Sequence, residues 1–363
     1  MLERLVRRTV REMEPYAWED STEQVAARHG LRPEDVVRFD LNTSPFPPAV
    51  WDAAMEAARA ERKPNEYFDT SYAALAAALS DYCGVPPEQL VIGAGADEIL
   101  DVVCKAFLDN GDVVVISAPT YSVYAIVATQ LGATVRAVPL GEGFRQDIDG
   151  LLAAARDAKV LFHCNPNSPT GNATPPADLK RLVAEAPCIV AVDEAYAEFA
   201  GWSAVPLIAK FPNLVVVKTL SKAFGMAGMR LGYGVAAPEV VAVLNRVRPP
   251  NSVSYVTARV AAAAVRDRAG MEEHVRAILA GCEPLAAGLR AAGAHVYPSV
   301  TNFLLTRWGG PADAQAIYDK MERQGFVVRN FAHSPLLPGH LRVTVRSAEE
   351  NAQFLAALRK EDA

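Results

Sequence analysis

The segment LVVVKTLSKAFGMAGMR, residues 214–230, joins an apolar run to a cluster of polar side chains. Its beginning, LVVVKTL, is typical of an inner strand of a parallel sheet. Lys222 follows Thr219 and Ser221, at the end of the strand where such sheets hold ligands. Arg230 comes eight residues later. A lysine that is kept neutral there is a nucleophile for a carbonyl, and hydroxyls with an arginine suit a phosphate.

Similar apolar runs lie on both sides of this segment and alternate with alanine-rich helical stretches. The runs that we expect to be buried parallel strands are LVIGAG (90–95), VVVIS (113–117), VLFHC (160–164), CIVAVDE (188–194) and RLGYGV (230–235). After about residue 257 the pattern is first helical and then mixes short strands with a helix. The sequence therefore predicts an α/β fold, with a large domain at residues 41–260 whose mostly parallel sheet is covered by helices. Residues 1–40 and 261–363 are expected to form a smaller α+β domain.

Composition excludes several classes of protein. The chain has 363 residues, 51% hydrophobic and 21% charged, with a net charge of -6, which argues against binding to nucleic acid or acidic membranes. Its five cysteines are scattered without a CxxC pair, as expected for reduced thiols in the cytoplasm rather than a metal site. The start, MLERLVRRTVREMEPY, has no secretory apolar core, and no apolar run is long enough to span a membrane.

Polar side chains also follow two neighbouring runs. Asp193 ends CIVAVDE, and a buried carboxylate needs a cationic partner, such as a protonated ring nitrogen. A helix N-cap is the alternative role for Asp193. Tyr196, three residues later, can reach the same ring. Asn165 opens the turn NPNSPTG after VLFHC, where its amide can bind a ring oxygen or form an Asx-turn.

Two further strand ends complete the set. In GAGADE (93–98), the backbone at Ala96 and Asp97 begins a helix and can attract a phosphate. A dinucleotide fingerprint fits this turn less well, because Glu98 stands where the third small residue belongs. Tyr121, after VVVIS, can stack on a ring or serve the core. Together, five strand ends offer a phosphate turn, an aromatic ring, an amide, a carboxylate and a lysine, which no purely structural role predicts.

This combination resembles the fold-type-I aminotransferases that depend on pyridoxal phosphate (PLP), in the histidinol-phosphate aminotransferase branch. The resemblance covers nearly the whole chain and is strongest in GAGADE, APTYSVY, CNPNSPTG, AVDEAY, KTLSKAFGMAGMR and LRVTVRS. It implies a large domain like that of aspartate aminotransferase. It also implies that Lys222 holds PLP as a Schiff base and later moves a proton at the substrate.

The resemblance assigns further roles around PLP. Asp193 would hold the ring nitrogen, Asn165 with Tyr196 the phenolic oxygen, and Tyr121 would stack on the ring. The cofactor phosphate would be bound by Ala96, Asp97, Thr219, Ser221, Arg230 and, from a partner subunit, Tyr67. A homodimer with shared active sites is therefore implied.

On the substrate side, the resemblance gives Arg342 in LRVTVRS the substrate carboxylate and Arg329 in FVVRNF the substrate phosphate. Tyr16 would close the site from the N-terminal arm. The expected reaction is transamination between histidinol phosphate and 2-oxoglutarate or glutamate, in histidine biosynthesis. The sequence departs from the branch at Asn42-Thr43-Ser44-Pro45, where Asn-Glu-Asn-Pro is usual, and at Arg346, where glycine is usual.

These departures lie near the predicted substrate side chain and leave alternatives open. An aromatic amino acid aminotransferase or a threonine-phosphate decarboxylase of the same branch would use the same cofactor residues. A nucleotide-dependent oxidoreductase built on GAGADE and a non-catalytic protein of the PLP fold are more distant alternatives.

Overall fold

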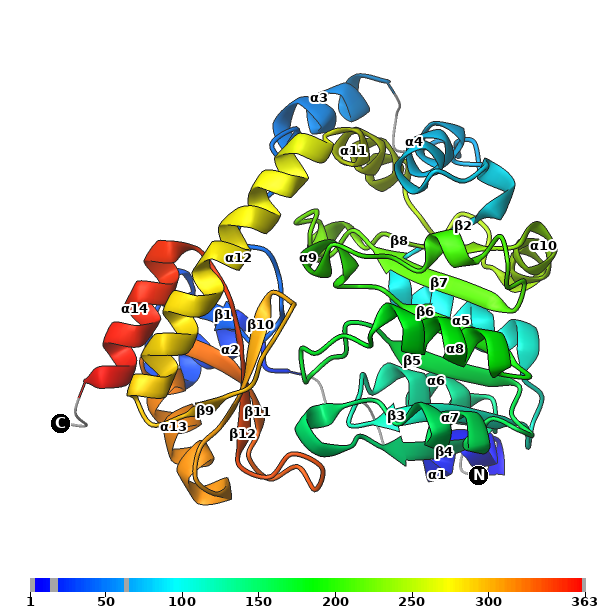
Figure 1. The fold of residues 1–363 in the computed structure, drawn as a ribbon. Coiled ribbons are helices and arrows are strands. Elements are labelled where there is room, and N and C mark those ends of the chain that lie inside the picture. The colour runs from blue at the N-terminus through cyan, green and yellow to red at the C-terminus, as the bar shows by residue number, and fades with distance from the viewer. Residues whose placement is uncertain (1–3, 14–18, 62–64, 361–363) are drawn as a thin grey trace.

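The computed structural model describes residues 4–13, 19–61 and 65–360, which contain two sheets (Figure 1). The larger sheet has seven strands in the order β2-β8-β7-β6-β5-β3-β4. Their bounds are β2 Leu90–Gly93, β3 Val113–Ala118, β4 Thr134–Pro139, β5 Val160–Cys164, β6 Ile189–Asp193, β7 Leu214–Thr219 and β8 Gly232–Ala236. The five neighbouring strands β7, β6, β5, β3 and β4 pair in parallel. The predicted α/β fold with a mostly parallel sheet is confirmed.

Helices cover both faces of this sheet because its inner strands are apolar on both sides. Leu214 and Val216 of β7 pack on one face, and Val215 and Val217 pack on the other. On the second face lie α5 (Ala96–Phe107), α6 (Val123–Gln130) and α10 (Pro238–Val247). The first face is covered by α7 (Ile148–Ala154) and α8 (Pro176–Glu185). Such two-sided burial is what the continuous valine-rich runs predict.

The direction of β8 differs from the prediction. The sequence predicted residues 230–235 as a parallel strand, but β8 pairs antiparallel with both β7 and β2. The chain between β7 and β8 contains only the short 3-10 turn η6 (Ala227–Met229), and a parallel connection needs a longer crossover, usually a helix. Edge strand β4 was also not predicted, because its sequence TVRAVP carries an arginine and little apolar periodicity.

The smaller sheet has the order β1-β11-β12-β10-β9. Its strands are β1 Val37–Phe39, β9 His295–Val296, β10 Phe303–Arg307, β11 Phe326–Phe331 and β12 His340–Thr344. Only the β1–β11 pair is parallel. Helices α2 (Thr22–His29), α13 (Pro311–Arg323) and α14 (Ala348–Arg359) lie beside it, and the long helix α12 (Arg268–Ala291) runs from it towards the upper helices in Figure 1.

The upper helices are α3 (Trp51–Glu61), α4 (Ala73–Cys83) and α11 (Tyr255–Arg266), and both α3 and α4 pack on α11. Helix α1 (Arg8–Glu12) contacts α6 of the large sheet. The division into residues 41–260 and the remainder stays a prediction. Within the described residues, no helix is long and apolar enough to cross a membrane, and no group of acidic, histidine and cysteine side chains is arranged to hold a metal ion.

Candidate functional site

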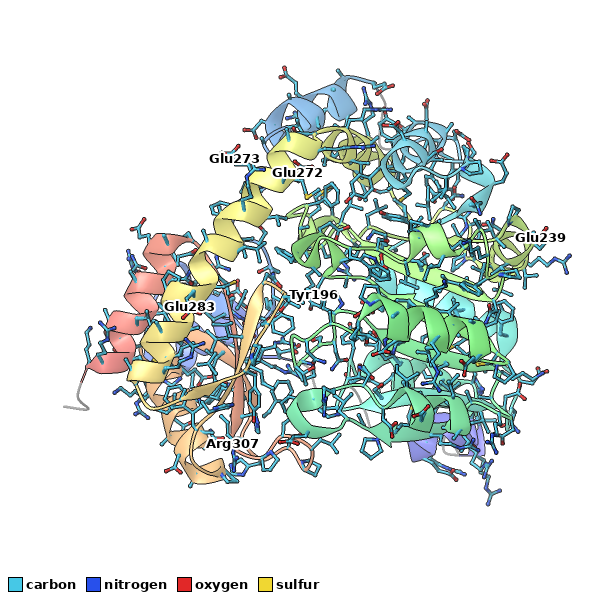
Figure 2. The ribbon with its side chains drawn as sticks, in the orientation of Figure 1. Tyr196, Glu239, Glu272, Glu273, Glu283 and Arg307 are labelled. Carbon is cyan, nitrogen blue, oxygen red and sulfur yellow. The ribbon has the colours of Figure 1, made fainter. Side chains whose placement is uncertain are left out.

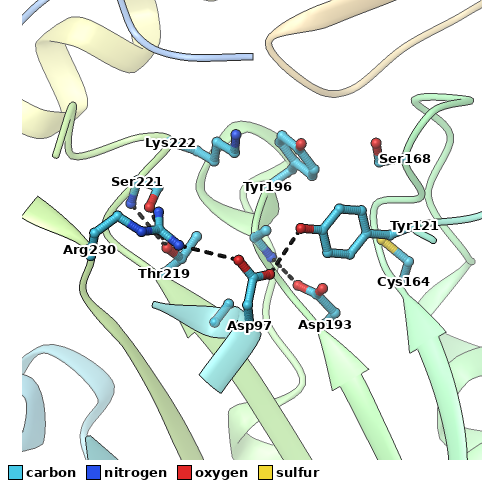
Figure 3. A pocket seen from close by; sticks show the side chains of 12 residues that line it. Asp97, Tyr121, Cys164, Ser168, Asp193, Tyr196, Thr219, Ser221, Lys222 and Arg230 are labelled. Atoms are coloured by element: carbon cyan, nitrogen blue, oxygen red, sulfur yellow. Dashed lines mark hydrogen bonds and ion pairs between the residues drawn. The ribbon is translucent and has the colours of Figure 1, made fainter. Parts of the chain in front are cut away.

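A cavity of about 130 Å³ lies at the carboxyl ends of the parallel strands (Figure 3). Parallel strands run the same way, so the residues that follow β5, β6 and β7 meet at one edge, and Cys164 of β5 is paired in register with Asp193 of β6. Most of the predicted cofactor residues line this cavity: Ala96, Asp97, Tyr121, Asp193, Tyr196, Thr219, Ser221, Lys222 and Arg230.

Lys222 reaches the cavity from the turn after β7. Its Nζ donates to the backbone oxygen of Leu41 at 3.0 Å and lies 5.9 Å from the centre of the Tyr196 ring. Burial lowers the pKa of Lys222 to about 8, and the Arg342 guanidinium adds to this effect. The amine is therefore far more often neutral than an ordinary lysine at the same pH, as a nucleophile for a carbonyl must be.

Asp193, at the end of β6, has only 3% of its surface exposed. One carboxylate oxygen accepts a hydrogen bond from the Tyr124 hydroxyl at 2.7 Å, and the other accepts from the Ala195 N–H at 3.0 Å. Burial raises the pKa of Asp193 to about 6, against the hydrogen bonds from Tyr124 and Ala195, which lower it. A buried carboxylate of this kind is suited to a cationic ligand group.

The opposite end of the cavity is built for an anion. Helix α5 begins there, and its first N–H groups have no partner within the helix. Arg230 contacts the Asp97 carboxylate at 3.2 Å, and Thr219 donates to the Ser221 hydroxyl at 3.0 Å (Figure 3). Gly95 has a φ of 93°, a backbone conformation that favours glycine, and the Arg230 guanidinium lies directly against it.

The two residues predicted to hold the ring oxygen, Tyr196 and Asn165, also have contacts within the protein, and their roles at the ring stay predictions. Tyr196 lies between the two sheets (Figure 2), where its hydroxyl accepts from Asn42 Nδ2 at 2.9 Å and its ring packs edge-on against Phe303 at 5.1 Å. Asn165 does not line the cavity. Its Oδ1 accepts from the Thr174 N–H at 2.8 Å, which is the local turn role that its position also allowed.

Arg342 is partly buried beside the cavity and has no acidic hydrogen-bond partner among the described residues. Its Nη1 donates to the Ser168 hydroxyl at 3.1 Å and its Nη2 to the Asp40 backbone oxygen at 2.6 Å. Its Nε is buried and has no hydrogen-bond partner among the described residues. A partly buried guanidinium that is held only by neutral groups can still bind a carboxylate through its remaining N–H groups.

The other predicted substrate and partner residues lie outside this cavity. Arg329 lines a neighbouring cavity of about 200 Å³ and forms an ion pair with Glu19. Tyr67 is 88% exposed and contributes nothing to the cavity of its own chain. Tyr16 falls outside the described residues.

Three side chains that support the site were not predicted: Tyr124, Asn42 and Ser168. Tyr124 lies three residues after Tyr121, just inside α6, and the two rings contact edge-on with centres 5.6 Å apart. Tyr124 also stacks on Phe162, with ring centres 5.1 Å apart. Asn42 and Ser168 reach Tyr196 and Arg342 only through folding, and no local pattern indicates these contacts.

Comparison with known proteins agrees with this arrangement. The family model for aminotransferase class I and II matches residues 34–358. A histidinol-phosphate aminotransferase of Roseiflexus castenholzii is 39% identical over 364 residues, covering 98% of each chain. That of Symbiobacterium thermophilum is 38% identical over 360 residues, again covering 98% of each. The crystal structure of the Sinorhizobium meliloti histidinol-phosphate aminotransferase in complex with PLP has a TM-score of 0.89 and 27% identity, covering 97% of this chain and 96% of that one.

Proposed function

This chain belongs to the class I and II aminotransferases, and from that premise we propose that it transfers an amino group between histidinol phosphate and 2-oxoglutarate or glutamate. The observation that carries the chemistry is that one cavity holds both a lysine with a lowered pKa and a buried aspartate with a raised pKa. The family match argues against the alternative of a nucleotide-dependent oxidoreductase, which the GAGADE turn also allowed.

PLP is the cofactor, and the described residues fit it. The Lys222 amine suits its aldehyde, the Asp193 carboxylate suits its ring nitrogen, and the start of α5 with Arg230 suits its phosphate. When bound, PLP acts as an electron sink that weakens bonds at the α-carbon of the substrate and carries the amino group between the two substrates.

The residues of the chain supply the rest of the reaction. We assign to Lys222 Nζ the removal and return of the substrate proton, because its lowered pKa keeps a useful fraction neutral near pH 7. Asp193 holds the proton on the ring nitrogen, since a buried carboxylate gains most from a cationic neighbour. Tyr121, beside Asp97, limits the tilt of the ring.

We also propose the substrate contacts. The carboxylate of glutamate or 2-oxoglutarate binds Arg342, whose Nε has no other partner among the described residues. The substrate phosphate binds Arg329, which lies directly opposite Arg342 on β11. In a homodimer, Tyr67 reaches the cofactor phosphate of the second copy. The side chain is 88% exposed in its own chain and is therefore accessible to a partner. The enzyme would act in histidine biosynthesis in the cytoplasm.

A panel of amino donors tests the substrate. Purified holoenzyme is mixed with histidinol phosphate, glutamate, phenylalanine or threonine phosphate, and the loss of the visible cofactor band is followed by stopped flow. We expect histidinol phosphate and glutamate to react with the highest kcat/KM, and Lys222→Ala to lose turnover with every donor. Equal kcat/KM for phenylalanine and histidinol phosphate would contradict the proposed substrate. Release of carbon dioxide from threonine phosphate would favour the decarboxylase instead.

A further inference from the structure

Two arginines lie side by side on neighbouring strands of the small sheet. Arg329 of β11 and Arg342 of β12 are directly paired in an antiparallel ladder. Side chains at such positions project from the same face, where like charges destabilise the pair. Burial lowers the pKa of Arg342, and the charge of Arg329 lowers it further. The pair therefore needs negative charge close by.

The charge on Arg329 is balanced by a residue far away in the sequence. Glu19 forms an ion pair with Arg329, and each side chain is 28% exposed. The other carboxylates that line this cavity have partners of their own. Asp40 pairs with Arg38 through hydrogen bonds of 2.9 and 2.6 Å, and Asp20 and Glu322 each pair with Arg28. Glu19 thus occupies the guanidinium to which the substrate tail is assigned above.

The backbone next to Glu19 is held independently of that ion pair. Asp20 pairs with Arg28, and its backbone oxygen accepts from Arg38 Nη1 at 2.9 Å. Because these contacts do not involve Arg329, the Glu19 side chain can leave Arg329 while residue 20 stays docked. A partly exposed carboxylate on a fixed backbone has the properties of a counter-ion that a ligand can displace.

We propose that Glu19 is a specificity-determining residue, an internal carboxylate that neutralises Arg329 until the anionic tail of a substrate displaces it. A substrate with an anionic tail must compete with Glu19 for the Arg329 guanidinium. A substrate with an uncharged tail lies beside the neutral Arg329–Glu19 ion pair instead of an unpaired guanidinium. Glu19 therefore sets how strongly the site prefers anionic over uncharged tails. This inference rests on the proposed function only in that Arg329 receives the substrate tail.

Inorganic phosphate is the probe, because it carries the charge of the tail without the rest of the substrate. Its dissociation constant is measured from thermal shifts of the holoenzyme, in which PLP already fills the cofactor site, at constant ionic strength. We expect Glu19→Gln to bind phosphate roughly twofold to fivefold more tightly than the unmodified protein, the gain expected from removing one partly exposed ion pair. Arg329→Gln should abolish that gain in the double variant.

Asp20→Asn is the matched control, since it removes the same charge one residue away without touching Arg329. An equal gain in Asp20→Asn would reduce the effect to net charge and overturn the proposal. No gain in Glu19→Gln would also overturn it. If Glu19→Gln folds poorly, as judged by the melting temperature without phosphate, Glu19→Ala is measured in its place.

A second measurement separates this inference from the proposed function. The ratio of kcat/KM for histidinol phosphate to that for phenylalanine should rise about twofold to fivefold in Glu19→Gln, because Arg329 then lacks its counter-ion beside an uncharged tail. If phosphate binding responds as expected but histidinol phosphate is not a substrate, only the proposed function fails. If histidinol phosphate reacts well and neither phosphate binding nor this ratio changes, only the role of Glu19 fails.

Discussion

Lys218 and Lys222 lie four residues apart, and their surroundings shift their pKa values in opposite directions. Burial and the Arg342 charge lower the pKa of Lys222 to about 8. Burial alone would also lower the pKa of Lys218, but the carboxylates of Glu198 and Glu194, at 3.0 and 3.2 Å, raise it above its ordinary value. Only one of the two lysines is thus prepared to react with a carbonyl.

Selective modification tests this difference. We expect an amine-acylating reagent to modify Lys222 of the PLP-free protein with a rate that rises with pH and levels off above about 8, because the neutral amine is the reactive form. Lys218 should stay unmodified throughout. Peptide mass spectrometry after short exposures reads both sites in one experiment. A Lys222 rate that still rises steeply at pH 10 would show that its pKa is not lowered.

Tyr124 is predicted to strengthen cofactor binding through Asp193. Tyr124→Phe removes a 2.7 Å hydrogen bond to a carboxylate but keeps the ring that stacks on Phe162. Since this hydrogen bond lowers the pKa of Asp193 against the effect of burial, its loss should weaken the hold on the ring nitrogen. We expect PLP to bind about tenfold to a hundredfold more weakly, as for loss of a hydrogen bond to a charged group.

The measurement is a PLP titration of the PLP-free protein followed by absorbance. Tyr233→Phe is the control, because it also removes a buried hydroxyl, one that contacts Cys83 rather than Asp193. PLP affinity that is the same in both variants would show that Tyr124 does not act through Asp193.

At the scale of elements, three charged side chains connect β7, which precedes Lys222, to the segment that follows Asp193. Lys218 of β7 contacts Glu194, just after β6, and Glu198 of α9 (Ala197–Ala200). All three side chains are almost fully buried. Such a triad contributes little net stability compared with apolar residues, but removing one member leaves uncompensated charge.

Lys218→Met is therefore expected to lower the free energy of unfolding by about 3–5 kcal/mol, because it strands two buried carboxylates. Urea denaturation of the PLP-free protein measures this change. The matched control is Lys105→Met on α5, which breaks a 2.6 Å pair with Asp101 at a partly exposed site and should cost less than about 1 kcal/mol. Similar losses for both variants would argue against the triad.

At the scale of the whole molecule, the exposed Tyr67 makes a prediction about assembly. If Tyr67 serves the cofactor phosphate of a partner, Lys222→Ala and Tyr67→Ala proteins should complement each other. A mixed dimer has one site with both residues intact and one with neither. Random exchange should restore about a quarter of the unmodified activity at a PLP concentration that leaves Tyr67→Ala mostly empty.

The activity of the mixture, compared with that of each variant alone, is the measurement, and light scattering determines the mass of each species. Mixing Lys222→Ala with Asp193→Asn is the control for the geometry: both residues line one cavity of one chain, so every site of a mixed dimer keeps one defect and no activity should be recovered. A monomeric mass, or no recovery with Tyr67→Ala, would exclude the shared site.

The sequence by itself determined the α/β class, the apolar strands and the polar residues at their ends. These depend on local periodicity and on the rule that parallel strands end at one edge, so Lys222 and Asp193 could be placed together without coordinates. The family resemblance supplied the cofactor, because several short motifs matched at once.

Only the tertiary structure decided which partners these residues meet. In the folded chain the Asn165 oxygen accepts from Thr174, β8 runs antiparallel to β7, and Arg329 pairs with Glu19, which is 310 residues away in the sequence. Such contacts depend on how strands and loops that are distant in the chain are brought side by side, and periodicity carries no information about them. Lys222 could therefore be predicted from its own segment, whereas the charge that neutralises Arg329 could be found only in the folded molecule.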